Sequence, residues 1–171
     1  MRVKIAAYTI LIFSMTLIQS TVLDNIRVYN IKPNLLMVLI VTSAFLSGNI
    51  EGAVVGFFCG LSQDMVSGKT IGLYALLGLY LGYSVGSIND RLYRENALIT
   101  VLITFVSTIV YEFSVYFLNW FYRGNMDFVF PFTRVILPEA LYNGIASVFI
   151  FIIVLKVKRK SEKSGKLSSR H

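Results

Sequence analysis

Apolar residues are grouped along the chain into six segments, which short clusters of charged or turn-forming residues separate. These segments cover residues 5–23, 33–50, 51–66, 70–89, 96–122 and 139–155. A helix needs about 17–25 predominantly apolar residues to cross a bilayer. The pattern therefore predicts an all-α, polytopic membrane helix bundle of six transmembrane helices. The third segment is short, rich in glycine and flanked by acids, and a re-entrant path there would leave five crossings.

Two of the segments carry glycine at every fourth position. The positions are Gly52, Gly56 and Gly60, continued by Asp64, and Gly78, Gly82 and Gly86, continued by Asp90. Steps of four residues form one smooth stripe along a helix. Glycine stripes allow another backbone to approach closely, which drives helix association in lipid. We expect close helix packing at these glycines, either between the two segments or with a partner's helix.

Glu112 is the one acid inside the long fifth segment. It lies 15 residues into this segment, or about 22 Å along a helix, in the outer half of the bilayer. A lone carboxylate there costs a few kcal/mol unless it is paired or protonated. We expect it to pair with Arg123 or Arg134, or to have a functional role.

The other acids lie near the ends of the predicted helices. Glu51 and Glu139 begin helices, where the helix dipole favours an anion. Asp64 and Asp90 lie near helix C-termini, where the dipole disfavours one, and basic residues follow each of them in sequence. Lys69 is the expected partner of Asp64.

Composition excludes several classes of protein. Hydrophobic residues make up 56% of the 171 positions and charged residues only 15%, which rules out a soluble enzyme, a coiled coil or a disordered scaffold. Cys59 and His171 are the single cysteine and histidine, so a zinc or iron site built on these residue types is excluded. No catalytic motif is present. We expect a non-enzyme without a cofactor.

Basic residues predict the orientation in the membrane. The net charge of +7 is concentrated in residues 156–171, so it does not indicate a nucleic-acid-binding face. Cytoplasmic loops carry an excess of Lys and Arg. This rule places both termini in the cytoplasm. We expect one transmembrane domain, residues 1–155, followed by a disordered basic cytoplasmic tail at 156–171.

Aromatic residues are concentrated between the fifth and sixth segments. They are Tyr116, Phe117, Trp120, Tyr122, Phe128, Phe130 and Phe132. Such residues typically form an interfacial belt at the level of the lipid headgroups. A lid over a cavity and a docking surface for a periplasmic partner are the alternatives.

A series of short motifs resembles the bacterial rod shape-determining MreD family over nearly the whole chain. The motifs are Gln19-Ser20-Thr21, Lys32-Pro33-Asn34-Leu35-Leu36, Glu51-Gly52, Gly56-Phe57-Phe58, Gly60-Leu61-Ser62-Gln63-Asp64, Ser67-Gly68, Gly72 and Tyr93-Arg94-Glu95-Asn96. The resemblance implies a non-catalytic inner-membrane subunit of the rod complex, which directs peptidoglycan synthesis and regulates cell shape. It also implies a fold related to the S components of energy-coupling-factor transporters.

The same resemblance implies the partners. They are MreC, the actin-like MreB, the polymerase RodA and its penicillin-binding transpeptidase, together with membrane lipids. We expect the stripe Gly52–Gly56–Gly60 to border a groove for the membrane helix of MreC, and Asp64 and the aromatic belt to position its extracytoplasmic stem. The basic tail would meet anionic lipid or a cytoplasmic partner.

The alternative function is a small-molecule-binding membrane component of a vitamin-type transporter. S components typically carry a ladder of alanines in their first helix. Here Ile10 and Leu11 follow four residues after Ala6 and Ala7, so this ladder is absent.

Overall fold

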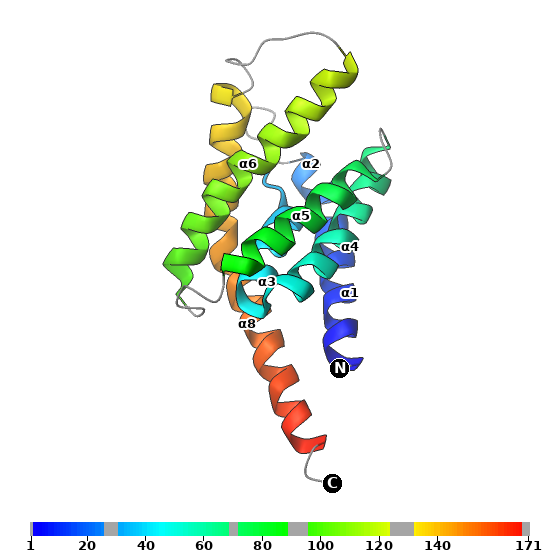
Figure 1. Cartoon of the computed structure of the whole chain (residues 1–171), viewed down its shortest axis with the longest axis vertical. Coiled ribbons are helices and arrows are strands. Elements are labelled where there is room, and N and C mark those ends of the chain that lie inside the picture. The colour runs from blue at the N-terminus through cyan, green and yellow to red at the C-terminus, as the bar shows by residue number, and fades with distance from the viewer. Residues whose placement is uncertain (1, 26–30, 69–71, 89–95, 124–131, 169–171) are drawn as a thin grey trace.

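The computed structural model describes residues 2–25, 31–68, 72–88, 96–123 and 132–168, and these residues are helical almost throughout (Figure 1). The prediction of an all-α bundle is confirmed. The elements are α1 (Arg2–Leu17), a π-helical turn η1 (Ile18–Val22), α2 (Leu23–Asn25), α3 (Leu35–Ser47), α4 (Asn49–Ser67), α5 (Leu73–Ile88), α6 (Ala97–Arg123), a second π-helical turn η3 (Phe132–Ile136) and α8 (Leu137–Ser168).

Helix α3 is the centre of the bundle and contacts α1, α4, α5, α6 and α8 (Figure 1). Every residue from Leu36 to Leu46 is buried. One side of α3 packs against α1, α4 and α8, and the other packs against α5 and α6. Its buried hydroxyls, on Thr42 and Ser43, donate to carbonyls of the same helix. The hydrophobic core is therefore built around α3.

The second predicted span is shorter than expected. Helix α3 has 13 residues, or about 20 Å, which is less than the roughly 30 Å of hydrocarbon in a bilayer. It begins after Asn34, whose side chain accepts the N–H of Met37. It ends at Gly48, whose φ of 97° is a backbone conformation that side chains rarely adopt. The third segment, expected to be the least secure, instead forms the 19-residue helix α4.

Within the described residues, three helical stretches are long and apolar enough to cross a membrane. They are Lys4–Val22, Ala97–Leu118 and Arg134–Ser161, while α3 and α5 are shorter apolar helices. In Figure 1, α4 and α5 run side by side and obliquely to α1 and α8. The bundle thus combines three long helices with a central short helix and a closely packed helix pair.

Both chain ends lie at the same end of the molecule (Figure 1). There Lys4 of α1 forms a salt bridge of 2.6 Å with Glu51 of α4. The ammonium of Lys158 donates to the carbonyl oxygen of Leu46, near the C-terminal end of α3. Helix α8 continues to Ser168, so the segment expected to be a disordered tail is helical over most of its length.

Candidate functional site

The two glycine stripes face each other across α4 and α5. A Cβ atom on Gly52 would lie 2.6 Å from the carbonyl oxygen of Gly82, and one on Gly60 would lie 2.5 Å from the carbonyl carbon of Tyr74. A Cβ on Gly56 would lie 2.7 Å from the carbonyl carbon of Gly78. Carbon atoms normally approach to about 3.5–4.0 Å. The two backbones are therefore in direct contact, and no side chain fits between them.

This contact corrects the expectation of a groove beside Gly52, Gly56 and Gly60. The stripe is covered by α5, so it is not open to a partner's helix. Gly86 packs in the same way against the backbone of Asn49, at the start of α4. The glycines hold the bundle's own helices together.

Asp64 lies in the last turn of α4 but caps the next helix. Its carboxylate accepts the backbone N–H groups of Gly72, Tyr74 and Ala75, each at 3.0 Å. The first N–H groups of a helix have no partner within that helix, and the helix dipole favours an anion beside them. Asp64 is 1% exposed and therefore fixes the start of α5. Lys69, its expected partner, lies outside the described residues, as does Asp90.

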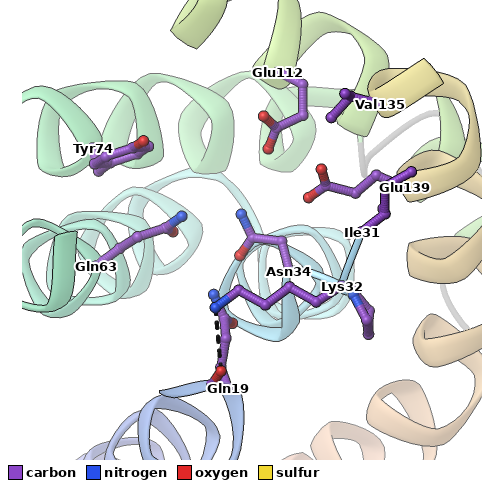
Figure 2. A pocket seen from close by; sticks show the side chains of 10 residues that line it. Gln19, Ile31, Lys32, Asn34, Gln63, Tyr74, Glu112, Val135 and Glu139 are labelled. Atoms are coloured by element: carbon purple, nitrogen blue, oxygen red, sulfur yellow. Dashed lines mark hydrogen bonds between the residues drawn. The ribbon is translucent and has the colours of Figure 1, made fainter. Parts of the chain in front are cut away.

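A polar cavity of about 200 Å³ lies beside the start of α3 (Figure 2). Side chains from six parts of the chain reach it. The lining residues are Gln19, Ile31, Lys32, Pro33, Asn34, Gln63, Tyr74, Glu112, Val135 and Glu139. The charged members are half-buried rather than sealed off. Polar groups in an apolar bundle are costly, so their convergence marks this cavity as the candidate site.

Glu112 of α6 and Glu139 of α8 point toward each other across the cavity (Figure 2). Their side chains interact, and Asn34 also interacts with Glu112. Lys32 is the cation whose charge acts on Glu139, and its ammonium lies 3.4 Å from the backbone oxygen of Gln19. Glu139 therefore does more than begin a helix, because it forms an acid pair that the sequence did not predict.

The structure does not show the expected pairing of Glu112 with Arg134. Arg134 is exposed, whereas the carboxylate of Glu112 faces the cavity (Figure 2). The side chain of Arg123 lies outside the described part of the chain.

Asn143 of α8 holds the cavity wall in place. Its amide oxygen accepts the backbone N–H of Asn34 at 2.7 Å, and its amide nitrogen donates to the hydroxyl of Thr108 at 3.2 Å. Asn143 is fully buried and so connects the start of α3 to α6 and α8. Thr108 and Thr104 also donate to carbonyls one turn earlier in α6. The acid pair is thus supported by a hydrogen-bonded polar network.

The sequence reading overlooked most of the cavity. It singled out Glu112, but it assigned no role to Gln19, Gln63 or Asn143. Each of these amides lies inside an otherwise apolar segment, and this isolated polarity could have indicated a polar cavity in the bundle.

The expected aromatic belt is described only in part. Tyr116 is half-buried and Phe117 is exposed on α6. The side chains of the remaining belt residues lie outside the described part of the chain: Trp120, Tyr122, Phe128, Phe130 and Phe132. Among the described residues, no group of three or more His, Cys, Asp or Glu side chains could hold a metal ion.

The helical bundle and its long apolar helices define a helical membrane protein. The sequence pattern of rod shape-determining protein MreD matches residues 1–161. The chain therefore belongs to the MreD family and takes part in rod shape determination. No curated protein and no solved structure is significantly similar to it.

Proposed function

We propose that this chain is a non-catalytic scaffold subunit of the rod complex, which binds MreC and supports peptidoglycan synthesis. Membership of the MreD family is the observation that carries this proposal. A bundle whose polar groups are largely engaged in structural hydrogen bonds also suits a scaffold better than an enzyme. MreB, RodA and the penicillin-binding transpeptidase are the further partners in this proposal.

The protein is proposed to cross the bacterial inner membrane several times with both termini in the cytoplasm. Two observations support this orientation. Both chain ends lie at the same end of the bundle (Figure 1), and the basic residues are concentrated there. Lys156 and Lys160 are exposed on α8, where each could add about 1 kcal/mol of attraction to anionic lipid.

The outer surface of the α4–α5 pair is the proposed contact for the membrane helix of MreC. Backbone packing through glycine leaves the larger side chains of the pair exposed, among them Phe57, Phe58, Tyr80 and Tyr83. Aromatic residues are enriched in protein interfaces, and a rigid surface loses little entropy on binding. The glycines would therefore act indirectly, by holding this surface in shape.

Photocrosslinking in membranes tests the contact. A photoreactive amino acid at Phe58 or Tyr80 should capture MreC. The same group at Phe149, an exposed position on α8, is the matched control and should capture it less. Capture of MreC from Phe149 alone would show that the interface lies on α8 instead. Failure of the protein to co-purify with MreC, together with failure to restore rod shape in cells lacking their own MreD, would contradict the scaffold proposal.

A small-molecule-binding membrane component is the second candidate, because the bundle contains a polar cavity. Its volume of about 200 Å³ is below the roughly 300–1,000 Å³ typical of pockets for drug-sized ligands. Vitamins belong to that size class, so the cavity favours a smaller occupant. Mass spectrometry of the purified protein would decide the question if it identified a retained vitamin.

A further inference from the structure

Three hydrogen-bond acceptors converge on the cavity from three different helices. They are the carboxylates of Glu112 in α6 and Glu139 in α8, and the amide oxygen of Gln63 in α4 (Figure 2). The Gln63 oxygen is buried and has no hydrogen-bond partner in the described part of the chain. A buried acceptor without a partner is unfavourable, so a donor in the cavity would be stabilising.

The charges in the cavity point to a cation. With Glu112, Glu139 and Lys32 ionised, the lining carries a formal charge of −1. Two facing carboxylates repel strongly where water is scarce, so the empty pair retains one proton, which the side-chain hydrogen bond between Glu112 and Glu139 requires. The charge of Lys32 acts on Glu139, and its ammonium contacts the backbone of Gln19. An entering cation would replace the shared proton and allow both carboxylates to be ionised.

The size and hydrogen-bonding capacity of the cavity narrow the class of cation. A volume of about 200 Å³ admits a small group and excludes a drug-sized molecule. An ammonium group has three N–H donors and no acceptor, which matches the three acceptor groups, the two carboxylates and the Gln63 amide oxygen. The half-buried state of these side chains leaves the cavity accessible to an entering group.

We propose that this cavity binds the primary ammonium group of a small organic amine, held by Glu112, Glu139 and Gln63. The amine is either a free solute or the ethanolamine headgroup of a membrane lipid, since both carry the same ammonium. This proposal does not depend on the binding of MreC.

Thermal unfolding of the full chain in detergent tests the proposal, with ethylammonium chloride as the probe. Ethylammonium should raise the midpoint temperature in a saturable manner, by about 3 °C or more near saturation. Tetramethylammonium at the same ionic strength carries the same charge but no N–H donor, so it should act only like sodium. Equal responses to the two organic cations would overturn the proposal.

Substitutions in the cavity test whether ethylammonium stabilises the protein by binding there. The double variant Glu112→Gln and Glu139→Gln keeps the side-chain shapes and should lose the response. Gln63→Leu removes only one uncharged acceptor and should weaken the apparent affinity about three- to tenfold. Lys32→Met removes a cation that competes with ethylammonium for the carboxylates, so it should increase the apparent affinity for ethylammonium. Glu51→Gln, at an acid outside the cavity, is the control and should keep the response.

The outcomes separate binding from adventitious ion effects. An unchanged ethylammonium response in the double glutamine variant would overturn the proposal. If that variant does not fold, the opposite shifts expected of Gln63→Leu and Lys32→Met still decide it, and the absence of both shifts would overturn it.

Nanodiscs distinguish the two sources of the amine. Phosphatidylethanolamine offers a primary ammonium, whereas phosphatidylcholine offers a quaternary one without N–H donors. If the lipid headgroup occupies the cavity, phosphatidylethanolamine should stabilise the wild type but not the double glutamine variant, and added ethylammonium should have little further effect. If the occupant is a solute, ethylammonium should stabilise the protein equally in both lipids.

Discussion

Gly56 lies where the backbones of α4 and α5 are in direct contact, and a single methyl group there tests this packing. In Gly56→Ala, the new Cβ would lie 2.7 Å from the carbonyl carbon of Gly78, with the carbonyl oxygen nearer still. Normal carbon–carbon contacts are about 3.5–4.0 Å. The obstacle is backbone, so no side-chain rotation relieves it. The helices must separate by about 1 Å.

Two opposing effects determine how much Gly56→Ala changes the free energy of unfolding. Overpacking of this kind costs about 1–3 kcal/mol and sometimes more. Replacement of glycine by alanine inside a helix stabilises that helix by up to about 1 kcal/mol. Separation of the helices also loosens the neighbouring contacts at Gly52 and Gly60, which adds to the loss. We expect a net destabilisation of about 1–3 kcal/mol, or a fall in midpoint temperature of about 3–9 °C for a chain of this size.

Thermal unfolding in detergent, followed by size-exclusion chromatography, measures this change. Gly144→Ala in α8 is the matched control, because its Cβ would meet only Val101 Cγ1, at 3.7 Å. That variant should be neutral or slightly stabilised. In the double variant Gly56→Ala and Gly78→Ala, one separation accommodates both methyl groups, so its loss should be less than the sum of the single losses. Wild-type stability of Gly56→Ala, or an equal loss in Gly144→Ala, would refute the reasoning.

Three further substitutions probe polar contacts by the same assay. Asp64→Ala leaves three backbone N–H groups without their acceptor and should lower the stability by about 3 kcal/mol or more, whereas Asp64→Asn keeps one acceptor and should lose less. Asn143→Leu breaks the bonds to Asn34 and Thr108 and should lose about 2–3 kcal/mol; wild-type stability would show that the network contributes little. Glu51→Gln removes the charge of one partner in a partly exposed ion pair but keeps a hydrogen-bond acceptor, so it should change the stability by less than about 1 kcal/mol; a larger loss would contradict this expectation.

The sequence predicted those features of the fold that depend on local periodicity. Long apolar runs identified the helices, because each span must satisfy its backbone hydrogen bonds internally. The spacing of Gly52, Gly56 and Gly60 matched that of Gly78 and its successors, so close packing followed from the pattern. The pattern left open whether the two stripes face each other or a partner.

Features that depend on the path between helices could not be predicted in this way. Asp64 was placed correctly at the end of its helix, but the sequence did not show that its carboxylate caps the start of the next helix. Similarly, α3 is short because Asn34 begins it and Gly48 ends it inside a continuous apolar run. The cavity combines side chains from distant segments, so no local pattern contains it.

The glycine packing and the cavity are physically connected at one end of the α4–α5 pair. Gly60 packs against Tyr74, which lines the cavity, and Gln63 follows Gly60 by about one helical turn. Gly86 packs equally tightly against Asn49, at the opposite end of the pair. Gly60→Ala and Gly86→Ala should therefore lower the stability by similar amounts, about 1–3 kcal/mol, through the same overpacking.

Only Gly60→Ala should also disturb the proposed ammonium site, because it displaces two of the lining side chains. We expect the apparent affinity for ethylammonium to fall at least threefold in Gly60→Ala and to remain unchanged in Gly86→Ala. Titration of both variants, each below its own midpoint temperature, makes the comparison independent of their stability. Equal affinities in the two variants would show that the helix pair and the cavity are separate parts of the molecule, so that the glycines maintain the bundle without shaping the site.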